Sequence, residues 1–408
     1  MTVRSIAEAL LVQAQEAPDA PAFIHGSSNG PIALSWRELA SAAAHHIATL
    51  DKSGFKHGDR VLTAIPNSLT WILTDLACQL RGWVHVAVDP QLPASRVDAV
   101  IHQTTPRAVI RRPVEPDDLL MDRMKSSDPA LPVPSPAIDI EDAAQILFTS
   151  GTTGAQKGVV LSHRNLLSNA AAKLEAAPQF QDDLRLNILP FSHAYARTCE
   201  LSSWILSGCS MAIARDWNHF CRMASELQPT LINLVPHLVD RAQQHIVANR
   251  NTSIRDAAAE LWGRKLRLLQ VGGAALRAET WNFFAALGLP PLQGYGLTET
   301  SPVICSNRAG EQRCGTVGSR CRNPYRRRND FGRVARTSCA RLLAKRLEAT
   351  QGVRLVDGWL NTGDLAEPDP TVPFVSSGRA DDVLVLSTRY RFHRMNCCMI
   401  GDAAFSNY

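Results

Sequence analysis

The chain has 408 residues, of which 45% are hydrophobic and 20% are charged, and its formal net charge is +5. This length and composition allow roughly two or three globular domains with a large core and exclude a disordered or fibrous chain. The ten cysteines show no paired metal-ligand spacing, which argues against a structural zinc site and against a disulfide framework.

The first part of the chain alternates helix-like and strand-like segments. Ser35 is the N-cap candidate of a helix over 34–50, where apolar residues recur at helical spacing. Such alternation predicts a parallel, doubly wound sheet. The expected helices are 34–50, 67–81 and 95–102, and the expected strands are 61–65, 84–88 and 108–110.

No segment of the sequence predicts a membrane span. Residues 1–18 have charges inside their apolar pattern and indicate an amphipathic helix, not a signal peptide. Residues 71–88 are fairly apolar but contain Asp75 and Arg81, so they fall short of a spanning helix. We therefore expect a cytoplasmic protein with no integral membrane segment.

A loop of small polar residues, TSGTTGAQKG, occupies 149–158 between two apolar runs. Two strands joined by such a loop present backbone N–H groups and hydroxyls to one point, which suits phosphate oxygens. Its glycines, Gly158 included, allow close backbone approach, and Lys157 adds a positive charge. A Walker A loop would place Ser or Thr after the lysine and lead into a helix. This sequence therefore predicts a different phosphate loop, with a flexible surface hairpin as the alternative. The candidate phosphate-binding residues are Thr149, Ser150, Gly151, Thr152, Thr153, Gly154 and Lys157.

A second alternating half follows the loop. Ser162 is expected to cap a helix that begins near His163. Strands are expected at 185–189, 211–214, 230–235 and 266–271, and a helix at 277–287. The sequence thus predicts an α/β fold in which two doubly wound subdomains, 1–184 with the phosphate loop and 185–306, form a large N-terminal domain.

Three further motifs follow in order: QGYGLTET at 293–300, GWLNTGDL at 358–365 and SGRADDVLVLS at 377–387. Together with the loop, they resemble the adenylate-forming superfamily of acyl-CoA synthetases, luciferases and peptide-synthetase adenylation domains. The run LPFSHAYART at 189–198 looks closest to the long-chain fatty acyl-CoA ligase branch. The resemblance covers about 5–318 and about 357–388, with Gln156 standing where the family usually has proline.

The resemblance implies that ATP activates a carboxylic acid, expected to be a medium- or long-chain fatty acid, to an acyl-adenylate and then to acyl-CoA. ATP, Mg²⁺ and the co-substrate CoA are the implied ligands. The loop would hold the β- and γ-phosphates. Thr298 would bind the α-phosphate, and Glu299 would hold Mg²⁺, which favours carboxylate plus phosphate oxygens. His193 would border the acyl pocket and the thiol tunnel.

The nucleoside contacts are also taken from the resemblance. The loop of Gly272, Gly273 and Ala274 follows a predicted strand, where ligands of α/β sheets collect, and would line one face of the adenine. Tyr295, next to Gly296, would stack on the other face. Asp364 would accept from the ribose hydroxyls, and Arg379 would contact ribose or phosphate. Each of these residues also has a structural alternative. The alternative is a tight turn for the 272–274 loop, an ordinary packed tyrosine for Tyr295, a loop cap for Asp364 and a surface arginine for Arg379.

The basic charge is concentrated in the interval 319–346, where the sequence does not resemble the family. Residues 319–346 contain nine arginines, one lysine and one aspartate, so they carry +9 and the remainder of the chain carries −4. A solvated face is the ordinary interpretation of a charge run, and a nucleic-acid patch is the alternative. Aromatic residues interleave only at Tyr325 and Phe331, so we expect no nucleic-acid partner. We hypothesise a compensated reading-frame disturbance, which translation of the other two frames would test.

The family resemblance also sets the expectation for the C-terminal part. In the family, the disturbed interval forms strands of a small barrel, so 307–378 is expected to be a degraded barrel. Residues 379–408 are expected to be a truncated remnant of a mobile domain, with Asp381 at its hinge and no counterpart of the family's late lysine. The alternative function is therefore a catalytically impaired nucleotide- or acyl-binding remnant of such a ligase.

Overall fold

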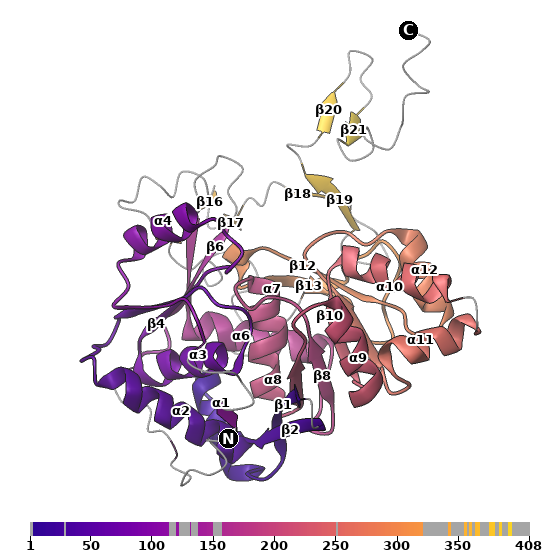
Figure 1. Ribbon diagram of the computed structural model, residues 1–408. Helices are drawn as coiled ribbons and strands as arrows, with labels where there is room; N and C mark the ends of the chain where they lie inside the picture. Colours follow the sequence, from indigo (N-terminus) through magenta and orange to yellow (C-terminus); the bar gives the residue numbers. More distant parts are fainter. Residues whose placement is uncertain are drawn as a thin grey trace.

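The computed structural model describes residues 3–27, 30–113, 120–121, 131, 138–149, 157–249 and 252–320. Beyond them it describes the backbone of seven short strands between residues 342 and 393. The fold is mixed α/β with two large sheets and flanking helices (Figure 1), as the sequence predicts. No closed barrel is seen in the described part of the chain.

The smaller sheet has six strands in the order β15-β7-β6-β4-β3-β5. Strands β3 to β6 run parallel, and β6 and β7 form an antiparallel hairpin. The strands predicted from the first part of the sequence are confirmed here. Their bounds are β3 (Arg60–Thr63), β4 (Val84–Ala87), β5 (Ala108–Ile110), β6 (Ala143–Thr149), β7 (Lys157–Ser162) and β15 (Leu342–Leu343).

The larger sheet has nine strands in the order β14-β13-β12-β11-β10-β8-β9-β1-β2. The neighbouring strands from β12 to β1 in this order pair in parallel, whereas the pairs β1–β2, β12–β13 and β13–β14 are antiparallel. The bounds are β1 (Pro21–Ser27), β2 (Gly30–Ser35), β8 (Leu184–Asn187), β9 (Ser210–Ile213), β10 (Leu231–Leu234), β11 (Leu268–Val271), β12 (Leu292–Gly296), β13 (Val303–Ser306) and β14 (Ser319–Arg320). The hairpin β1–β2 therefore extends a sheet built mainly from the second half of the chain.

Three two-stranded sheets make up the rest of the described C-terminal part. They pair β16 (Leu355–Val356) with β17 (Trp359–Leu360), β18 (Asp364–Glu367) with β19 (Val375–Arg379), and β20 (Val383–Val385) with β21 (Arg391–His393).

The two large sheets and their helices form five layers. Side chains alternate along each strand, so successive residues of one strand enter different hydrophobic cores. In β3, Val61 joins the central hydrophobic cluster and Leu62 joins an outer one. In β10, Leu231 joins the central cluster and Ile232 joins the other outer one. The layer between the sheets consists of α1 (Ile6–Glu16), α2 (Trp36–Asp51), α3 (Leu69–Arg81), α6 (His163–Ala176) and α8 (Ser203–Ser207).

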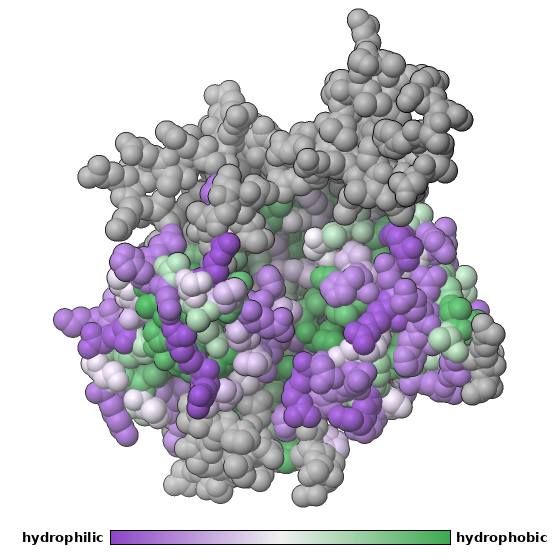
Figure 2. Space-filling view, turned by 45° about the horizontal axis from the view of Figure 1, so that its top comes forward, coloured by the Kyte–Doolittle hydropathy of each residue, from purple (hydrophilic) through white to green (hydrophobic). Residues whose placement is uncertain are grey.

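The outer faces of the sheets carry the remaining long helices (Figure 1). Helix α4 (Ala94–Thr104) covers the six-stranded sheet. The nine-stranded sheet is covered by α9 (Trp217–Leu227), α10 (Pro236–Ala248), α11 (Ile254–Trp262) and α12 (Ala278–Ala286). Hydrophilic side chains dominate the outside in Figure 2, and hydrophobic ones come to view between the two halves. None of the helices within the described residues is long and apolar enough to cross a membrane.

Two predicted N-caps are confirmed. The Ser35 hydroxyl accepts from the Glu38 N–H at 3.3 Å, and the Glu38 carboxylate accepts from the Ser35 N–H at 2.7 Å. This reciprocal capping box satisfies two of the free N–H groups at the start of α2. The Ser162 hydroxyl accepts from the Asn165 N–H at 3.2 Å in the same way, so α6 begins directly after the β6–β7 hairpin.

The central layer also contains a fully buried charge cluster. The Asp75 carboxylate accepts from Arg197 Nη2 at 2.9 Å and lies 3.0 Å from His85 Nδ1, and His85 Nε2 lies 2.8 Å from the Thr63 hydroxyl. Burial raises the pKa of Asp75, but Arg197 and His85 outweigh that effect, so its pKa lies below the ordinary value. The carboxylate is therefore charged at neutral pH and pairs with a buried guanidinium.

Candidate functional site

The carboxyl ends of the parallel strands of the two sheets lie close to each other. Asn67 follows β3 and Leu189 follows β8, and Asn67 Nδ2 donates to the Leu189 carbonyl at 2.7 Å. Asp89 follows β4, and its carboxylate lies 3.8 Å from Nε2 of His193. Ligands of open α/β sheets bind beyond the carboxyl ends of the strands. The junction between the two sheets is therefore the candidate site.

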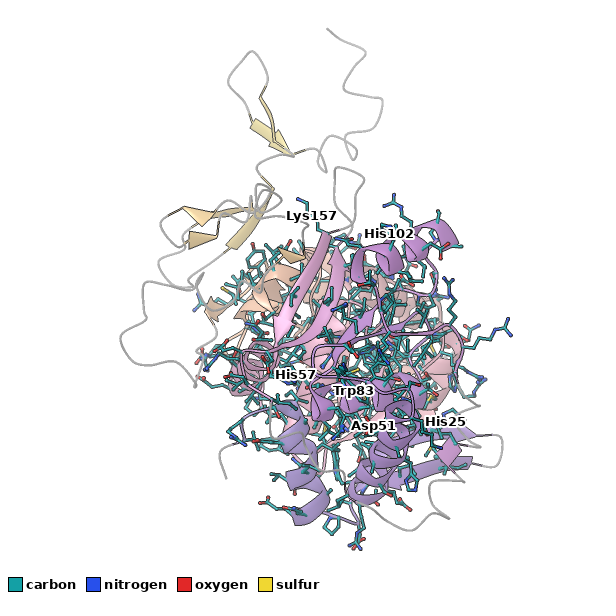
Figure 3. The ribbon with its side chains drawn as sticks, turned by 90° about the vertical axis from the view of Figure 1, so that its left-hand side faces the viewer. His25, Asp51, His57, Trp83, His102 and Lys157 are labelled. Carbon is teal, nitrogen blue, oxygen red and sulfur yellow. The ribbon has the colours of Figure 1, made fainter. Side chains whose placement is uncertain are left out.

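The phosphate-loop candidate is the connection between β6 and β7. Thr149 and Lys157 are directly opposed at the loop end of the hairpin, and the Thr149 hydroxyl donates to the Lys157 carbonyl at 3.5 Å. Both residues are half-buried, and Figure 3 shows Lys157 at the outer end of its strand. The strand–loop–strand arrangement is thereby confirmed. The other candidate residues, Ser150, Gly151, Thr152, Thr153 and Gly154, lie outside the described residues.

Three glycines of the predicted motifs are explained by packing of the protein itself. A Cβ at Gly158 would lie 3.2 Å from side chains of the facing strand β6, and one at Gly272 would lie 2.8 Å from the Tyr195 ring. At Gly296 a Cβ would lie 1.7 Å from the Pro302 carbonyl oxygen, and a backbone atom cannot rotate out of the way. At Gly296 the need for glycine therefore comes from the fold and does not depend on a ligand, whereas at Gly158 and Gly272 a Cβ would require neighbouring side chains to shift.

The predicted adenine-binding residues lie on neighbouring strands. Strands β11 and β12 are parallel, with Val271 opposite Gln293, so the loop 272–274 and the segment 294–296 leave the sheet side by side. Gly273 and Ala274 are exposed, and Tyr295 and Gly296 are half-buried. Gly273 has a φ of +85°, a conformation that favours glycine. The loop and Tyr295 thus come from the same edge, and their role toward adenine stays a prediction.

Thr298 and Glu299 lie in a short 3₁₀ helix, η2 (Thr298–Thr300), immediately after β12. Both are half-buried, so the hydroxyl and the carboxylate remain within reach of a ligand. Among the described residues no group of three or more His, Cys, Asp or Glu residues could hold a metal ion. A single carboxylate fits Mg²⁺ when substrate phosphates and water complete its oxygen ligands. Glu299 therefore fits a metal that arrives with a nucleotide, not a resident one.

His193 lies at the start of helix α7 (Ala194–Ala196), after the loop that follows β8. Its side chain is exposed, and its N–H donates to the Pro190 carbonyl at 3.1 Å. Helix α7 continues into a π-helix, η1 (Arg197–Ser202), which carries the buried Arg197. Tyr195 packs against Gly272, so the His193 segment and the 272–274 loop are in contact.

The sequence analysis missed two residues of this junction, Asn67 and Asp89. Both follow a predicted strand of the first sheet and both adjoin a proline, Pro66 and Pro90. A polar residue at the carboxyl end of a parallel strand is a signal that could have identified them. Their partners on the second sheet are not evident from the sequence, because the contacts join residues more than a hundred positions apart.

The C-terminal candidates are described only by their backbone. Asp364 and Arg379 are directly opposed in the antiparallel pair β18–β19, so residues fifteen positions apart come together. Asp381 lies outside the described residues, as does most of the basic interval. The described residues do not test the barrel, hinge and reading-frame hypotheses.

The comparisons with known proteins agree with this geometry. The structure resembles apo MatB from Rhodopseudomonas palustris, with a TM-score of 0.77, 22% identity and coverage of 96% of this chain and 82% of that one. It also resembles the N-terminal domain of FACL13 from Mycobacterium tuberculosis, with a TM-score of 0.74, 22% identity and coverage of 92% and 100%. The fold of this chain is therefore the one that these two solved proteins have.

The sequence comparisons define the family. The family model of the AMP-binding enzymes matches residues 10–325. A feruloyl-CoA synthase of Amycolatopsis is 27% identical, with 91% of this chain and 78% of the relative covered. The fatty acid–acyl-carrier-protein ligase MmaC of Mycobacterium marinum is 25% identical, with 93% and 79% covered. The chain belongs to the AMP-binding enzyme family.

Proposed function

We propose that this protein uses ATP to convert a carboxylic acid to an acyl-adenylate and then transfers the acyl group to CoA. In the first step a carboxylate oxygen attacks the α-phosphorus of ATP and pyrophosphate leaves. In the second step the CoA thiolate attacks the acyl carbonyl and AMP leaves. The observation that carries the proposal is the family match over 10–325, which includes the hairpin, the 272–274 loop and the Thr298–Glu299 segment.

In the first step, the protein's part would be placement and neutralisation of phosphate charge. Thr149 and Lys157, at the loop end of the β6–β7 hairpin, would contact the β- and γ-phosphates. Thr298 would donate to the α-phosphate, and Glu299 would hold Mg²⁺, which when bound neutralises the phosphate oxygens. ATP is supported by the family and by a solved relative described as ATP-bound MatB.

The nucleoside would lie at the carboxyl edge of β11 and β12. The loop 272–274 would line one face of the adenine and Tyr295 the other, since a flat base gains from an aromatic face. Asp364 would accept hydrogen bonds from the ribose hydroxyls, and the opposed Arg379 would contact ribose or phosphate.

The acid is proposed to be a medium- or long-chain fatty acid, because the run at 189–198 resembles that branch and because MmaC is described as a fatty-acid ligase. A hydroxycinnamic acid is the second candidate. It is supported by the feruloyl-CoA synthase and by a 4-coumarate-CoA ligase of Narcissus pseudonarcissus that is 24% identical. In either case the exposed His193 would border the acyl group and the incoming thiol.

Acid-dependent exchange of labelled pyrophosphate into ATP tests the first step. The panel contains short, long and aromatic acids, and the expected result is exchange that requires Mg²⁺ and is highest with a long-chain acid. Highest exchange with ferulate or coumarate would support the second candidate instead. Exchange without acyl-CoA formation would indicate an impaired remnant of the ligase. Failure to bind ATP, measured by calorimetry, would refute the proposal.

Salt-dependent binding of DNA or RNA tests the remaining alternative, an arginine-rich nucleic-acid binder. The matched variant lacks residues 319–346, and the comparison is made at two salt concentrations. Binding that disappears with this interval would favour the alternative over the ligase.

A further inference from the structure

Two asparagine side chains join segments of the nine-stranded sheet to elements outside that sheet. The first is Asn67, between β3 and α3. Its Nδ2 donates to the Leu189 carbonyl at 2.7 Å and to the Asn187 Oδ1 at 3.0 Å, and its Oδ1 accepts from the Phe191 N–H at 2.9 Å. One amide therefore holds both sides of the loop that leads to His193.

The second is Asn169, on α6, which follows the β6–β7 hairpin. Its Nδ2 donates to the Val303 carbonyl at 2.9 Å and to the Thr300 carbonyl at 3.4 Å, and its Oδ1 accepts from the Val303 N–H at 3.0 Å. Thr300 is the residue directly after Glu299. Asn169 therefore links α6, the helix that directly follows the phosphate-loop hairpin, to the segment that carries Thr298 and Glu299.

The chemistry of the two contacts is the same. A primary amide offers a donor and an acceptor on one planar group, so it can bind a backbone N–H and a backbone C=O together. Both side chains are half-buried, so their role is not to fill the apolar core. Each bonds with residues more than a hundred positions away in the chain. Segments at the end of β8 and at the start of β13 thus receive hydrogen bonds from elements outside the nine-stranded sheet.

We propose that Asn67 and Asn169 are positioning residues that act on different steps of the reaction. Asn169 fixes the Thr298–Glu299 segment relative to the hairpin, and so serves the ATP-dependent step. Asn67 fixes the 189–193 loop, with His193 opposite Asp89, and so serves the acid and the thiol. The assignment of steps rests on the proposed function, whereas the tie between the two halves rests on the hydrogen bonds alone.

Amide hydrogen exchange tests the ties without any need for activity. Asn67→Ala removes the acceptor of the Phe191 N–H, and Asn169→Ala removes that of the Val303 N–H. Each variant is expected to exchange on the order of tenfold faster in its own segment, 187–193 or 298–306, with the other segment unchanged. The matched control is Asn249→Ala, which removes an exposed hydrogen bond to Glu260. Equal acceleration of both loops in each variant, or acceleration in neither, would overturn the proposal.

Steady-state kinetics then tests the division of roles. Asn169→Ala is expected to raise the KM for ATP about tenfold with the KM for the acid within about twofold, and Asn67→Ala is expected to show the reverse pattern. Asn→Asp at either position keeps the acceptor but places a carboxylate oxygen against the carbonyls to which the amide donates, so its effect should be at least as large as that of Asn→Ala. Equal changes of both KM values in either variant would refute the assignment of steps. An inactive wild-type protein would instead refute the proposed function and with it the two roles, while hydrogen exchange would still decide whether the ties exist.

Discussion

The substitution Asp75→Leu is expected to be among the most destabilising single changes in this protein. It removes the carboxylate that accepts two hydrogen bonds from Arg197 and one from Gln79, and that contacts His85. Asp75, Arg197 and His85 are all fully buried. The guanidinium of Arg197 would remain inside the central layer without its carboxylate, keeping only its contact with Ser202 at 2.6 Å.

The magnitude follows from the asymmetry of buried ion pairs. Removing one partner leaves an uncompensated charge and costs about 3–5 kcal/mol, whereas replacing both partners with apolar residues is often neutral or stabilising. The double variant Asp75→Leu/Arg197→Met should therefore recover much of the loss. An exposed pair provides the control, because Arg264 and Asp256 lie 3.3 Å apart with side chains 74% and 50% exposed. Such pairs contribute about 0–1 kcal/mol, so Arg264→Ala should have little effect.

Urea denaturation measures these differences as shifts of the unfolding midpoint at constant slope. The expected order of stability is wild type and Arg264→Ala first, then the double variant, then Asp75→Leu. The reasoning is wrong if Asp75→Leu loses no more free energy of unfolding than Arg264→Ala. It is also wrong if the double variant is as unstable as the single one, because the cost would then come from packing and not from the buried charge.

Three further predictions concern the candidate site and the pH dependence of stability. Lys157→Ala should lower the affinity for ATP or pyrophosphate roughly tenfold with little change in melting temperature, because a phosphate contact beside the loop contributes to binding and not to the core; equal loss of both would contradict it. Gly296→Ala should abolish nucleotide binding and lower the melting temperature, because its Cβ would lie 1.7 Å from the Pro302 carbonyl oxygen; a normally stable variant that binds ATP would show the reasoning to be wrong. Burial lowers the pKa of His163 from 6.5 to about 4, so the unfolded chain binds more protons between these values and stability should rise with pH from about 4 to about 6.5. In urea titrations, His163→Leu should remove part of the rise of unfolding free energy with pH. Burial also lowers the pKa of His46 to about 4, so His46 should account for another part. An unchanged dependence of unfolding free energy on pH in His163→Leu would count against this cause.

Local sequence signals predicted the starts of helices and the phosphate-loop hairpin. Ser35 and Ser162 act as N-caps because each hydroxyl reaches an N–H three residues later, a contact that depends on nearby residues alone. Runs of apolar residues predicted β6 and β7 on either side of the loop. The sequence analysis did not identify helices α9 to α11, whose apolar residues contact strands of the larger sheet.

What the sequence by itself determined about this protein is its family, its alternation of strands and helices, and the residue types that suit phosphate, metal and base. Tertiary structure decided which strands became neighbours. The hairpin β1–β2 joined β9, although its residues precede the first sheet in the chain. It also decided the hydrogen bonds of Asn67 and Asn169, because a half-buried amide acquires its partners only when segments more than a hundred residues apart have packed together. The physical reason is the sequence distance over which each interaction acts. Caps and strand patterns depend on neighbours along the chain. Sheet order and the contacts between the two sheets depend on the burial of surfaces that the chain brings together only on folding.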